Sequence, residues 1–429
     1  DLPKRTLLWR IVQDHVNPDL LFAGTEFGIY FTVDGGQEWT KLTGDAPTIS
    51  FRDLAIQRRE NDLVGATFGR GFFILDDYSP LREVSKEQLE KKAALFPVRD
   101  AWWYIPRGIL GRSKKGSQGE GYYVADNPPY GAVFTLYLKN DIKTIKEERQ
   151  EKEKELQKSD ENIPFPGWEK LDEEKFQQEP TLWLTVKDTE GNVVRKIKVP
   201  VKKGFQRVAW DLRYPSVRAI TERSGRNSSG MLAAPGSYNV SLSSEVNGKV
   251  TDLAGPVSFE LKPLYESSIP GPTYEEATDF WKELGDFQRA LGALNIILNE
   301  TLKTVNLMEE SLSRSSFEPG PLNTQTHDLK QELQEIRTTL YGNSSRTEVG
   351  EKNPPTIIQR VSIVQTGTSN STYGPTQTHR RSLEIAKEEF SVLKEKLEKV
   401  TNEKVPNLLE KLYKSGAPWL EGMPVPEGR

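Results

Sequence analysis

The fold of this chain is decided by the stretch Thr32-Val33-Asp34-Gly35-Gly36-Gln37-Glu38-Trp39. The Asp34 carboxylate can accept hydrogen bonds from backbone amides within a tight turn. Gly35 and Gly36 tolerate the positive φ angles that such a turn needs. Trp39 offers a large apolar surface, which we expect to bury against a neighbouring sheet. We therefore predict that Thr32, Asp34, Gly36 and Trp39 are structural residues of a turn between strands.

A second, weaker copy of this pattern follows at an offset of 43 positions. Residues 19–34 align without gaps on residues 62–77, so that Asp34 falls on Asp77. The second copy is degenerate, because Ser79 and Arg82 stand where Gly36 and Trp39 stand in the first. A repeat of about this length is typical of the four-stranded blades of a β-propeller. We interpret the degenerate copy as the last blade.

Two blades do not close a propeller, which typically has at least ~4. Because the sequence begins at Asp1 without Met or a signal peptide, we expect it to be the C-terminal portion of a longer polypeptide. Residues 1–92 are then the last blades of a propeller that an upstream segment completes, either in the same precursor or as a separate fragment. The alternative is a short, self-contained β-sheet.

Composition narrows the range of functions. A length of 429 residues allows about three domains of ~100–200 residues each. The 58 basic and 62 acidic residues give a net charge of −4 without a concentrated basic face, so we predict no nucleic-acid partner. The chain contains no cysteine, which excludes disulfides, thiol catalysis and Cys-ligated metal centres. It also lacks a run of ~18 apolar residues, so no membrane-spanning helix is predicted.

The middle of the chain changes character twice. Residues 93–129 form a Gly- and Tyr-rich linker, in which residues 101–104 and 116–123 are either a carbohydrate-stacking ledge or packing at a domain face. Residues 130–265 contain runs of β-branched and aromatic alternation, which predict a β-sandwich. A run of Lys, Glu and Gln predicts a charged helical insertion at about 141–178, held by i,i+4 charge pairs. This insertion is either a solvated helix or a docking arm for a partner.

The period of the apolar residues becomes helical from Thr273 onward, which predicts an α-helical bundle over residues 273–420. Further apolar series at residues 329–340, 357–364 and 383–400 predict the other members of the bundle, and Pro406 predicts a break. The first and longest helix has apolar residues at Phe280, Leu284, Phe287, Leu291, Leu294, Leu298, Val305, Met308 and Leu312.

No pattern of residues predicts catalysis. No two of the three histidines, His15, His327 and His379, have metal-ligand spacing, and the chain has no phosphate-binding loop or nucleophile elbow. We therefore predict no catalytic residue, no cofactor and no metal site. Carboxylates of the propeller part are candidate acids for glycoside hydrolysis, and Arg70 is able to hold an anionic group, although turn and backbone-binding roles fit these residues better. The candidate acids are Glu26, Asp53, Asp76 and Asp77, of which Glu26 and Asp76 join Arg70 as predicted ligand contacts of the propeller channel.

Residues 23–30, the turn after them and residues 69–78 resemble the final blades of a known family. Its members are large exported proteins of the Bacteroidota type with a sortilin-like Asp-box (BNR) β-propeller, often labelled glycosyl hydrolase or sialidase. The strand ending in Trp210-Asp211 and the turn at Pro235-Gly236 resemble an immunoglobulin-like module of secreted bacterial proteins. Residues 381–386 and 416–419 are similar to the end of the same family.

The resemblance implies propeller blades, an immunoglobulin-like β-sandwich and a helical bundle in a protein of the periplasm, the cell surface or the extracellular space. It favours a non-catalytic component whose propeller binds a polypeptide or a glycan. One alternative is a sialidase-like glycoside hydrolase whose catalytic residues lie mainly upstream. Another is an accessory subunit of an outer-membrane secretion or uptake complex.

Overall fold

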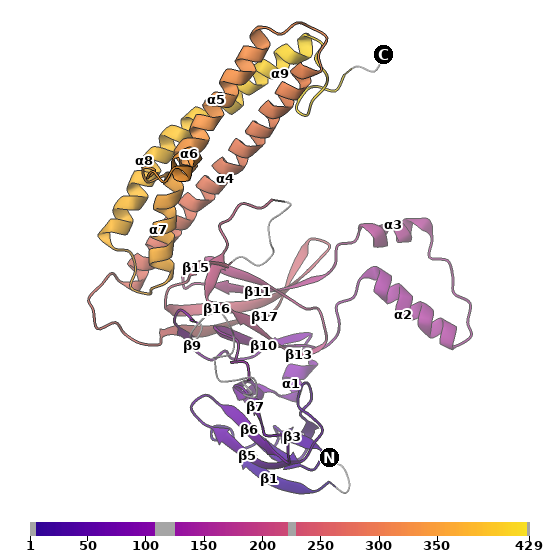
Figure 1. Cartoon of the computed structure of the whole chain (residues 1–429). Helices are drawn as coiled ribbons and strands as arrows, with labels where there is room; N and C mark the ends of the chain where they lie inside the picture. Colours follow the sequence, from indigo (N-terminus) through magenta and orange to yellow (C-terminus); the bar gives the residue numbers. More distant parts are fainter. Residues whose placement is uncertain (1–5, 108–124, 222–228, 427–429) are drawn as a thin grey trace. The chain divides into compact units, whose positions relative to one another are not determined.

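The computed structural model of the chain describes residues 6–107, 125–221 and 229–426. The chain divides into two compact units, Asp1–Leu212 with Pro235–Leu264, and Arg213–Ala234 with Tyr265–Arg429. The first unit is built mainly of β-sheets and the second mainly of long helices, in the predicted order (Figure 1). Within the described ranges, no helix combines the length and the apolarity needed to cross a membrane.

Two antiparallel sheets open the first unit. One has the strand order β1-β2-β3-β4 and the other the order β5-β6-β7. In the part of the chain that the structure describes, these sheets do not close into a propeller. Their strands are β1 (Leu8–Gln13), β2 (Leu21–Thr25), β3 (Gly28–Thr32), β4 (Thr40–Lys41), β5 (Phe51–Gln57), β6 (Asp62–Thr67) and β7 (Phe72–Leu75), followed by a 3₁₀ turn (Ser79–Glu83) and α1 (Lys86–Glu90).

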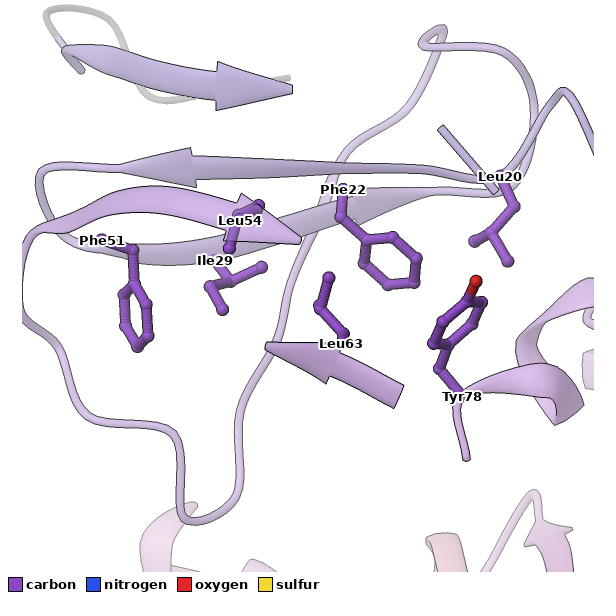
Figure 2. Close-up of a cluster of buried hydrophobic side chains, with 7 residues drawn as sticks. All are labelled: Leu20, Phe22, Ile29, Phe51, Leu54, Leu63 and Tyr78. Atoms are coloured by element: carbon purple, nitrogen blue, oxygen red, sulfur yellow. The ribbon is translucent and has the colours of Figure 1, made fainter. Parts of the chain in front are cut away.

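The two sheets share one apolar core, which Figure 2 shows. Each of its side chains is at most 4% exposed, and Phe22 and Tyr78 meet edge to face with their ring centroids 5.0 Å apart. Burying a large apolar side chain stabilises a fold by about 1.5–3 kcal/mol, so this core holds the two sheets together. Its members are Leu20, Phe22, Ile29, Phe51, Leu54, Leu63 and Tyr78.

The two sheets repeat each other strand by strand. The pairing of β1 with β2 shifts between Leu8 and Arg10, and that of β5 with β6 shifts between Phe51 and Asp53, so an irregularity recurs 43 positions later. In the first sheet Leu8 lies opposite Thr25, and in the second Phe51 lies opposite Thr67.

The structural offset of the second strand is therefore 42 positions, from Thr25 to Thr67, where the ungapped alignment predicted 43. The extra residue lies in the hairpin, since two residues separate Thr25 from Gly28 and three separate Thr67 from Gly71. The Thr25 hydroxyl donates a hydrogen bond to the Gly28 carbonyl, and the Thr67 hydroxyl donates one to the Gly71 carbonyl. Both donor–acceptor distances are 2.8 Å. These equal contacts support the corrected alignment.

Two further sheets complete the first unit. One has the order β13-β10-β8 and the other the order β12-β11-β16-β17-β9. They pack through aromatic rings, because Phe134 of β10 and Trp210 of β13 both lie edge to face against Phe259 of β17. The strands are β8 (Ala93–Leu95), β9 (Ala101–Trp103), β10 (Ala132–Leu138), β11 (Thr181–Lys187), β12 (Val193–Val199), β13 (Gly204–Trp210), β16 (Gly236–Val246) and β17 (Lys249–Pro263).

The predicted linker over residues 93–129 is partly sheet. Strand β8 pairs with β10, and β9 pairs in parallel with β17. Trp103 of β9 is 3% exposed, so one part of the aromatic stretch packs inside the unit. Residues 116–123, the other stretch named as a carbohydrate ledge, lie outside the described residues.

Two helices occupy the predicted charged insertion, α2 (Ile145–Lys158) and α3 (Trp168–Phe176). The Arg149 guanidinium connects them, because it donates to both carboxylate oxygens of Glu174 at 2.6 and 2.9 Å and to Glu153 at 2.6 Å. Such a bidentate pair fixes geometry better than a single contact does.

The helical unit follows the apolar series of the sequence, and all nine residues named for its first helix are buried. Pro406 does not break the chain's helical course, because a π-helical turn (Val400–Lys404) joins two helices and the proline lies in the first turn of the second. The helices are α4 (Tyr274–Ser313), α5 (Pro321–Tyr341), α6 (Ser344–Glu348), α7 (Ile357–Ser369), α8 (Gln377–Lys399) and α9 (Val405–Lys414).

A hairpin from within the predicted sandwich belongs to this helical unit instead. It consists of β14 (Arg213–Pro215) and β15 (Ser229–Leu232), which form a sheet of their own. The Lys282 ammonium of α4 lies over the Tyr214 ring, 5.8 Å from the ring centroid. The contacts of a short hairpin with a distant helix cannot be inferred from strand alternation, which is why the sequence placed it elsewhere.

Candidate functional site

The first turn, residues 32–39, uses its polar side chains internally. Asp34 Oδ1 accepts hydrogen bonds from the Thr32 hydroxyl at 2.6 Å and from the amides of Gln37 and Glu38, each at 3.0 Å. The hydrogen bond from the Glu38 amide, followed by that from the Thr32 hydroxyl, lowers the pKa of the Asp34 carboxyl. The Trp39 indole donates to the Gly36 carbonyl at 3.1 Å. All four residues therefore make hydrogen bonds within this turn, and Trp39 is half-buried with its indole bonded to its own loop.

The second turn, residues 75–82, has a different arrangement. Asp77 adopts a positive φ of 42°, and its Oδ1 accepts from the Ser79 hydroxyl at 2.6 Å. Arg82, which replaces the tryptophan, turns to Asp14 instead. Its Nε and Nη2 atoms donate to the two oxygens of that carboxylate, each over 2.8 Å. The degenerate turn therefore contributes its cation to a buried pair.

Asp14 is the most enclosed carboxylate of this region, at 4% exposure. Besides Arg82, it accepts from the Tyr78 hydroxyl at 2.6 Å and from the Asn17 amide at 2.7 Å. Burial by itself raises the pKa of the Asp14 carboxyl, but the hydrogen bonds from Arg82 and Tyr78 outweigh burial and hold that pKa well below its usual range. A carboxylate satisfied in this way is a structural joint, not a ligand contact.

The three predicted ligand contacts do not gather at one place. Glu26 lies in the β2–β3 hairpin, where it accepts from the Trp9 indole at 3.0 Å and from the Ser50 hydroxyl at 3.2 Å. Arg70 lies in the β6–β7 hairpin, and Asp76 follows the other end of β7. The four residues of β7 therefore separate Arg70 from Asp76 by roughly 13 Å of extended chain. Of the other candidate acids, Asp53 pairs with Arg10 at 3.4 Å.

Asp76 borders a cavity of about 610 Å³ in the first unit. Its walls come from four segments: the turn after β7, the β9 region, residues 127–133 leading into β10, and strand β13. Arg207 of β13 joins two of them, since its guanidinium donates to the carbonyls of Asp76 at 2.6 Å and Asp77 at 3.1 Å. The remaining lining includes Arg99, Asp100, Trp102, Tyr104, Asn127 and Tyr130.

Aromatic side chains form one wall of this cavity. Tyr104 and Tyr130 meet edge to face with their ring centroids 5.0 Å apart, and the Tyr130 hydroxyl donates to the Tyr104 carbonyl. Trp102 is 46% exposed, whereas its neighbour Trp103 is 3% exposed. The alternation of β9 explains this contrast, because successive side chains point to opposite faces of a strand. Trp102 therefore presents an indole ring beside the cavity.

Most charged groups of the cavity already have a hydrogen-bond or ion-pair partner in the described residues. Asp100 pairs with Lys262 at 2.5 Å, and Asp77 accepts from Ser79. Arg99 donates to the Glu60 carbonyl at 2.8 Å and to the Glu60 carboxylate at 2.9 Å. Burial raises the pKa of the Asp76 carboxyl, and the Asp62 carboxylate raises that pKa further, against the opposing effect of Arg207 and Arg99.

Sequence reasoning identified Asp76 but missed most of this cavity. The segments that build it are far apart in the chain, and strand alternation says nothing about which of them meet. The exposed Trp102 was the one usable signal, since it stands in the stretch interpreted as either a stacking ledge or packing. In the described ranges, no cluster of His, Asp and Glu has the arrangement of a metal site.

Comparisons with known proteins add little. No protein-family model and no curated protein matches the chain. The chain is weakly similar to two solved structures of extracellular domains from B. thetaiotaomicron. One belongs to a proposed one-component system and the other to a proposed hybrid two-component system, with sequence identities to this chain of 10% and 11% and TM-scores of 0.14. A third is the BSP domain of a biofilm-associated protein, at 8% identity and a TM-score of 0.16.

These matches cover 61%, 61% and 58% of this chain. The chain spans only 26%, 26% and 28% of the respective solved chains. At such TM-scores the likeness carries no conclusion about fold or function.

Proposed function

We propose that the cavity beside Asp76 and Trp102 binds a glycan without cleaving it. The exposed indole of Trp102 at the rim of a polar cavity carries this proposal. A sugar ring has an apolar face that packs on an aromatic ring and hydroxyl groups that both donate and accept hydrogen bonds. Asp76, Asn127 and the guanidinium groups of the cavity supply the matching acceptors and donors.

Binding is favoured over hydrolysis because the carboxylates are occupied. Most glycoside hydrolases need two carboxyl groups placed on either side of the scissile bond. Asp77 is used by its own turn and Asp100 by an ion pair, which leaves Asp76 as the carboxyl free of a strong partner among the described residues that line the cavity. A single acid does not provide that chemistry.

The proposal places this site in an exported bacterial protein. On the sequence resemblance, the two N-terminal sheets are blades of an Asp-box propeller, the next two sheets an immunoglobulin-like sandwich, and the helices a C-terminal bundle. The bulge and the hairpin contacts repeated between the two N-terminal sheets support the blade assignment. Cell fractionation of the producing organism tests the location, and recovery of the protein in the cytoplasm would contradict it.

The test of binding is a glycan array probed with the full chain. We expect binding to a subset of glycans, lost in Trp102→Ala and kept in Trp168→Ala, a change at another exposed tryptophan on α3. Absence of glycan binding, or unchanged binding by Trp102→Ala, would overturn the proposal. Trp102-dependent capture of members of a displayed peptide library would assign the cavity to a polypeptide instead.

A further inference from the structure

Four apolar side chains of the two N-terminal sheets are exposed, although three of their counterparts in the repeat are buried and the fourth is half-buried. Leu8 and Ile11 of β1 are 42% and 46% exposed, whereas Phe51 and Leu54 at the same positions of β5 are 0% and 2% exposed. Phe72 of β7 is 74% exposed, whereas Ile29 at the same position of β3 is 4% exposed. Ile74, the fourth, is 58% exposed and corresponds to the half-buried Phe31.

The buried counterparts show what each exposed position does. Phe51 and Leu54 pack against the first sheet at Gly24, where an added Cβ would lie 2.9 Å from the Phe51 carbonyl oxygen and 3.3 Å from Leu54 Cγ. Ile29 of β3 belongs to the same core and faces the second sheet, since its Cδ1 atom would lie 3.3 Å from a Cβ added at Gly65 of β6 (Figure 2). In the contact between the sheets, β5 therefore supplies one half and β2 with β3 supply the other.

The exposed residues fall on the two unused halves of this contact. Leu8 and Ile11 are the positions with which the first sheet would pack onto a sheet before it. Phe72 and Ile74 are the positions onto which a sheet after the second would pack. A contact of this head-to-tail kind leaves one half free at each end of a row, unless the row closes on itself.

We propose that both free faces are docking surfaces for further sheets of the same repeat, encoded before residue 1 of this sequence. Consecutive sheets pack on each other here, so a preceding sheet of the repeat covers Leu8 and Ile11. The first sheet of the series covers Phe72 and Ile74, which closes the ring and removes its exposed edges. The proposal rests on the blade assignment made above and not on the glycan site.

The test uses the full chain and the polypeptide encoded directly upstream of the Asp1 codon in the same reading frame, expressed together. We expect the two to co-purify in equal amounts. Two double substitutions should each weaken binding of the upstream polypeptide by at least about tenfold: Leu8→Asp/Ile11→Asp and Phe72→Asp/Ile74→Asp. The matched control is Val193→Asp/Val250→Asp, two exposed apolar positions of the first unit outside the repeat, which should capture like wild type.

Three outcomes would overturn the proposal: absence of such a reading frame, failure of the two polypeptides to associate, or capture that neither double substitution changes. Self-association of the 429-residue chain alone, abolished by the same substitutions in sedimentation velocity, would assign the faces to a second copy instead. The variants should keep their glycan binding, so failure of this proposal is distinguishable from failure of the glycan site.

Discussion

The turns at residues 32–39 and 75–82 occupy the same place in two copies of one repeat, yet different contacts hold them. The first turn is closed by short-range hydrogen bonds to Asp34 and by a tryptophan that donates to its own loop. The second replaces the tryptophan with Arg82, whose guanidinium reaches the buried Asp14, 68 positions away in sequence. In the second copy the turn thus takes part in a long-range contact, between Arg82 and Asp14, instead of a local one.

This difference teaches that degeneracy in a repeat can be structural. Asp34 is half-buried and accepts its hydrogen bonds from its own turn, so its loss affects a local loop. Asp14 and Arg82 connect the loop after β1 with the end of the second sheet, so their loss affects the contact between the sheets. Because breaking a buried pair leaves an uncompensated charge, the second arrangement is more sensitive to substitution than the first.

The largest expected effect is that of Asp14→Asn. Removal of the charge leaves the partly buried Arg82 guanidinium without its anionic partner, and we expect the N-terminal sheets to lose about 3–5 kcal/mol of stability. Urea-dependent hydrogen exchange of peptides from β2 and β6 measures this region separately from the rest of the chain. Asp34→Asn is the matched control and should cost clearly less. Equal losses in the two variants would contradict the distinction between the turns.

Arg82→Trp is the next test, because it restores the residue type of the first turn. We expect a loss of about 3 kcal/mol, at the lower end of the range for a broken buried pair, since Tyr78 and the Asn17 amide still hold the Asp14 carboxylate. The same hydrogen-exchange measurement applies. If Arg82→Trp left stability unchanged or raised it, the Asp14–Arg82 pair would not stabilise the contact between the two sheets.

The pH dependence sharpens the comparison. The folded pKa of Asp14 is depressed, so its contribution is fully present above the unfolded pKa of about 3.9 and is lost as the pH falls below that value towards the folded pKa. The unfolded state binds more protons in that window, so stability rises with pH there. Arg82, Tyr78 and the His15 ring, 3.4 Å from the carboxylate, surround Asp14.

The measurement is the difference in stability between wild type and Asp14→Asn as a function of pH. Other carboxylates contribute to both proteins and cancel. We expect the difference to shrink on acidification below about pH 4. A difference that stays constant down to pH 2 would contradict the assignment of the lowered pKa to Asp14.

The smallest expected effect is that of Thr32→Val in the first turn. Thr32 is 1% exposed and its hydroxyl donates to Asp34 and accepts from the Gly36 amide at 3.1 Å. Loss of these contacts should cost about 1 kcal/mol, since valine keeps the shape of the side chain. Hydrogen exchange at the Gly36 and Gln37 amides should rise more than exchange in β2. A loss as large as that of Asp14→Asn would contradict the local character of this turn.

The sequence predicted local features well and relations between distant segments poorly. The turn chemistry of Asp34 and the apolar series of α4 depend on neighbouring residues, and both are present in the structure. The offset of the second strand was wrong by one residue, because a shorter loop before β6 compensates the longer hairpin after it. An ungapped alignment cannot detect such a pair of changes.

The candidate site shows the same limit. Asp76 was named as one of the candidate acids of the propeller part, but nothing in the sequence placed Arg207 on its carbonyl, 131 positions away. Strands β8 and β9 have only three residues each, too few for their alternation to stand out from a linker. The proposed ligand contacts Glu26 and Arg70 stay predictions.

The central claim is that the two N-terminal sheets are units of one repeat with their outer faces covered by further units. The most direct measurement is the rate of thiol labelling at Ile11→Cys and Ile74→Cys, which is clean because the chain has no cysteine of its own. We predict fast labelling in residues 1–429 alone, like that of the exposed control Val250→Cys, and at least about tenfold slower labelling of both sites in the product of the complete reading frame. Equally fast labelling of all three sites in that product would contradict the claim.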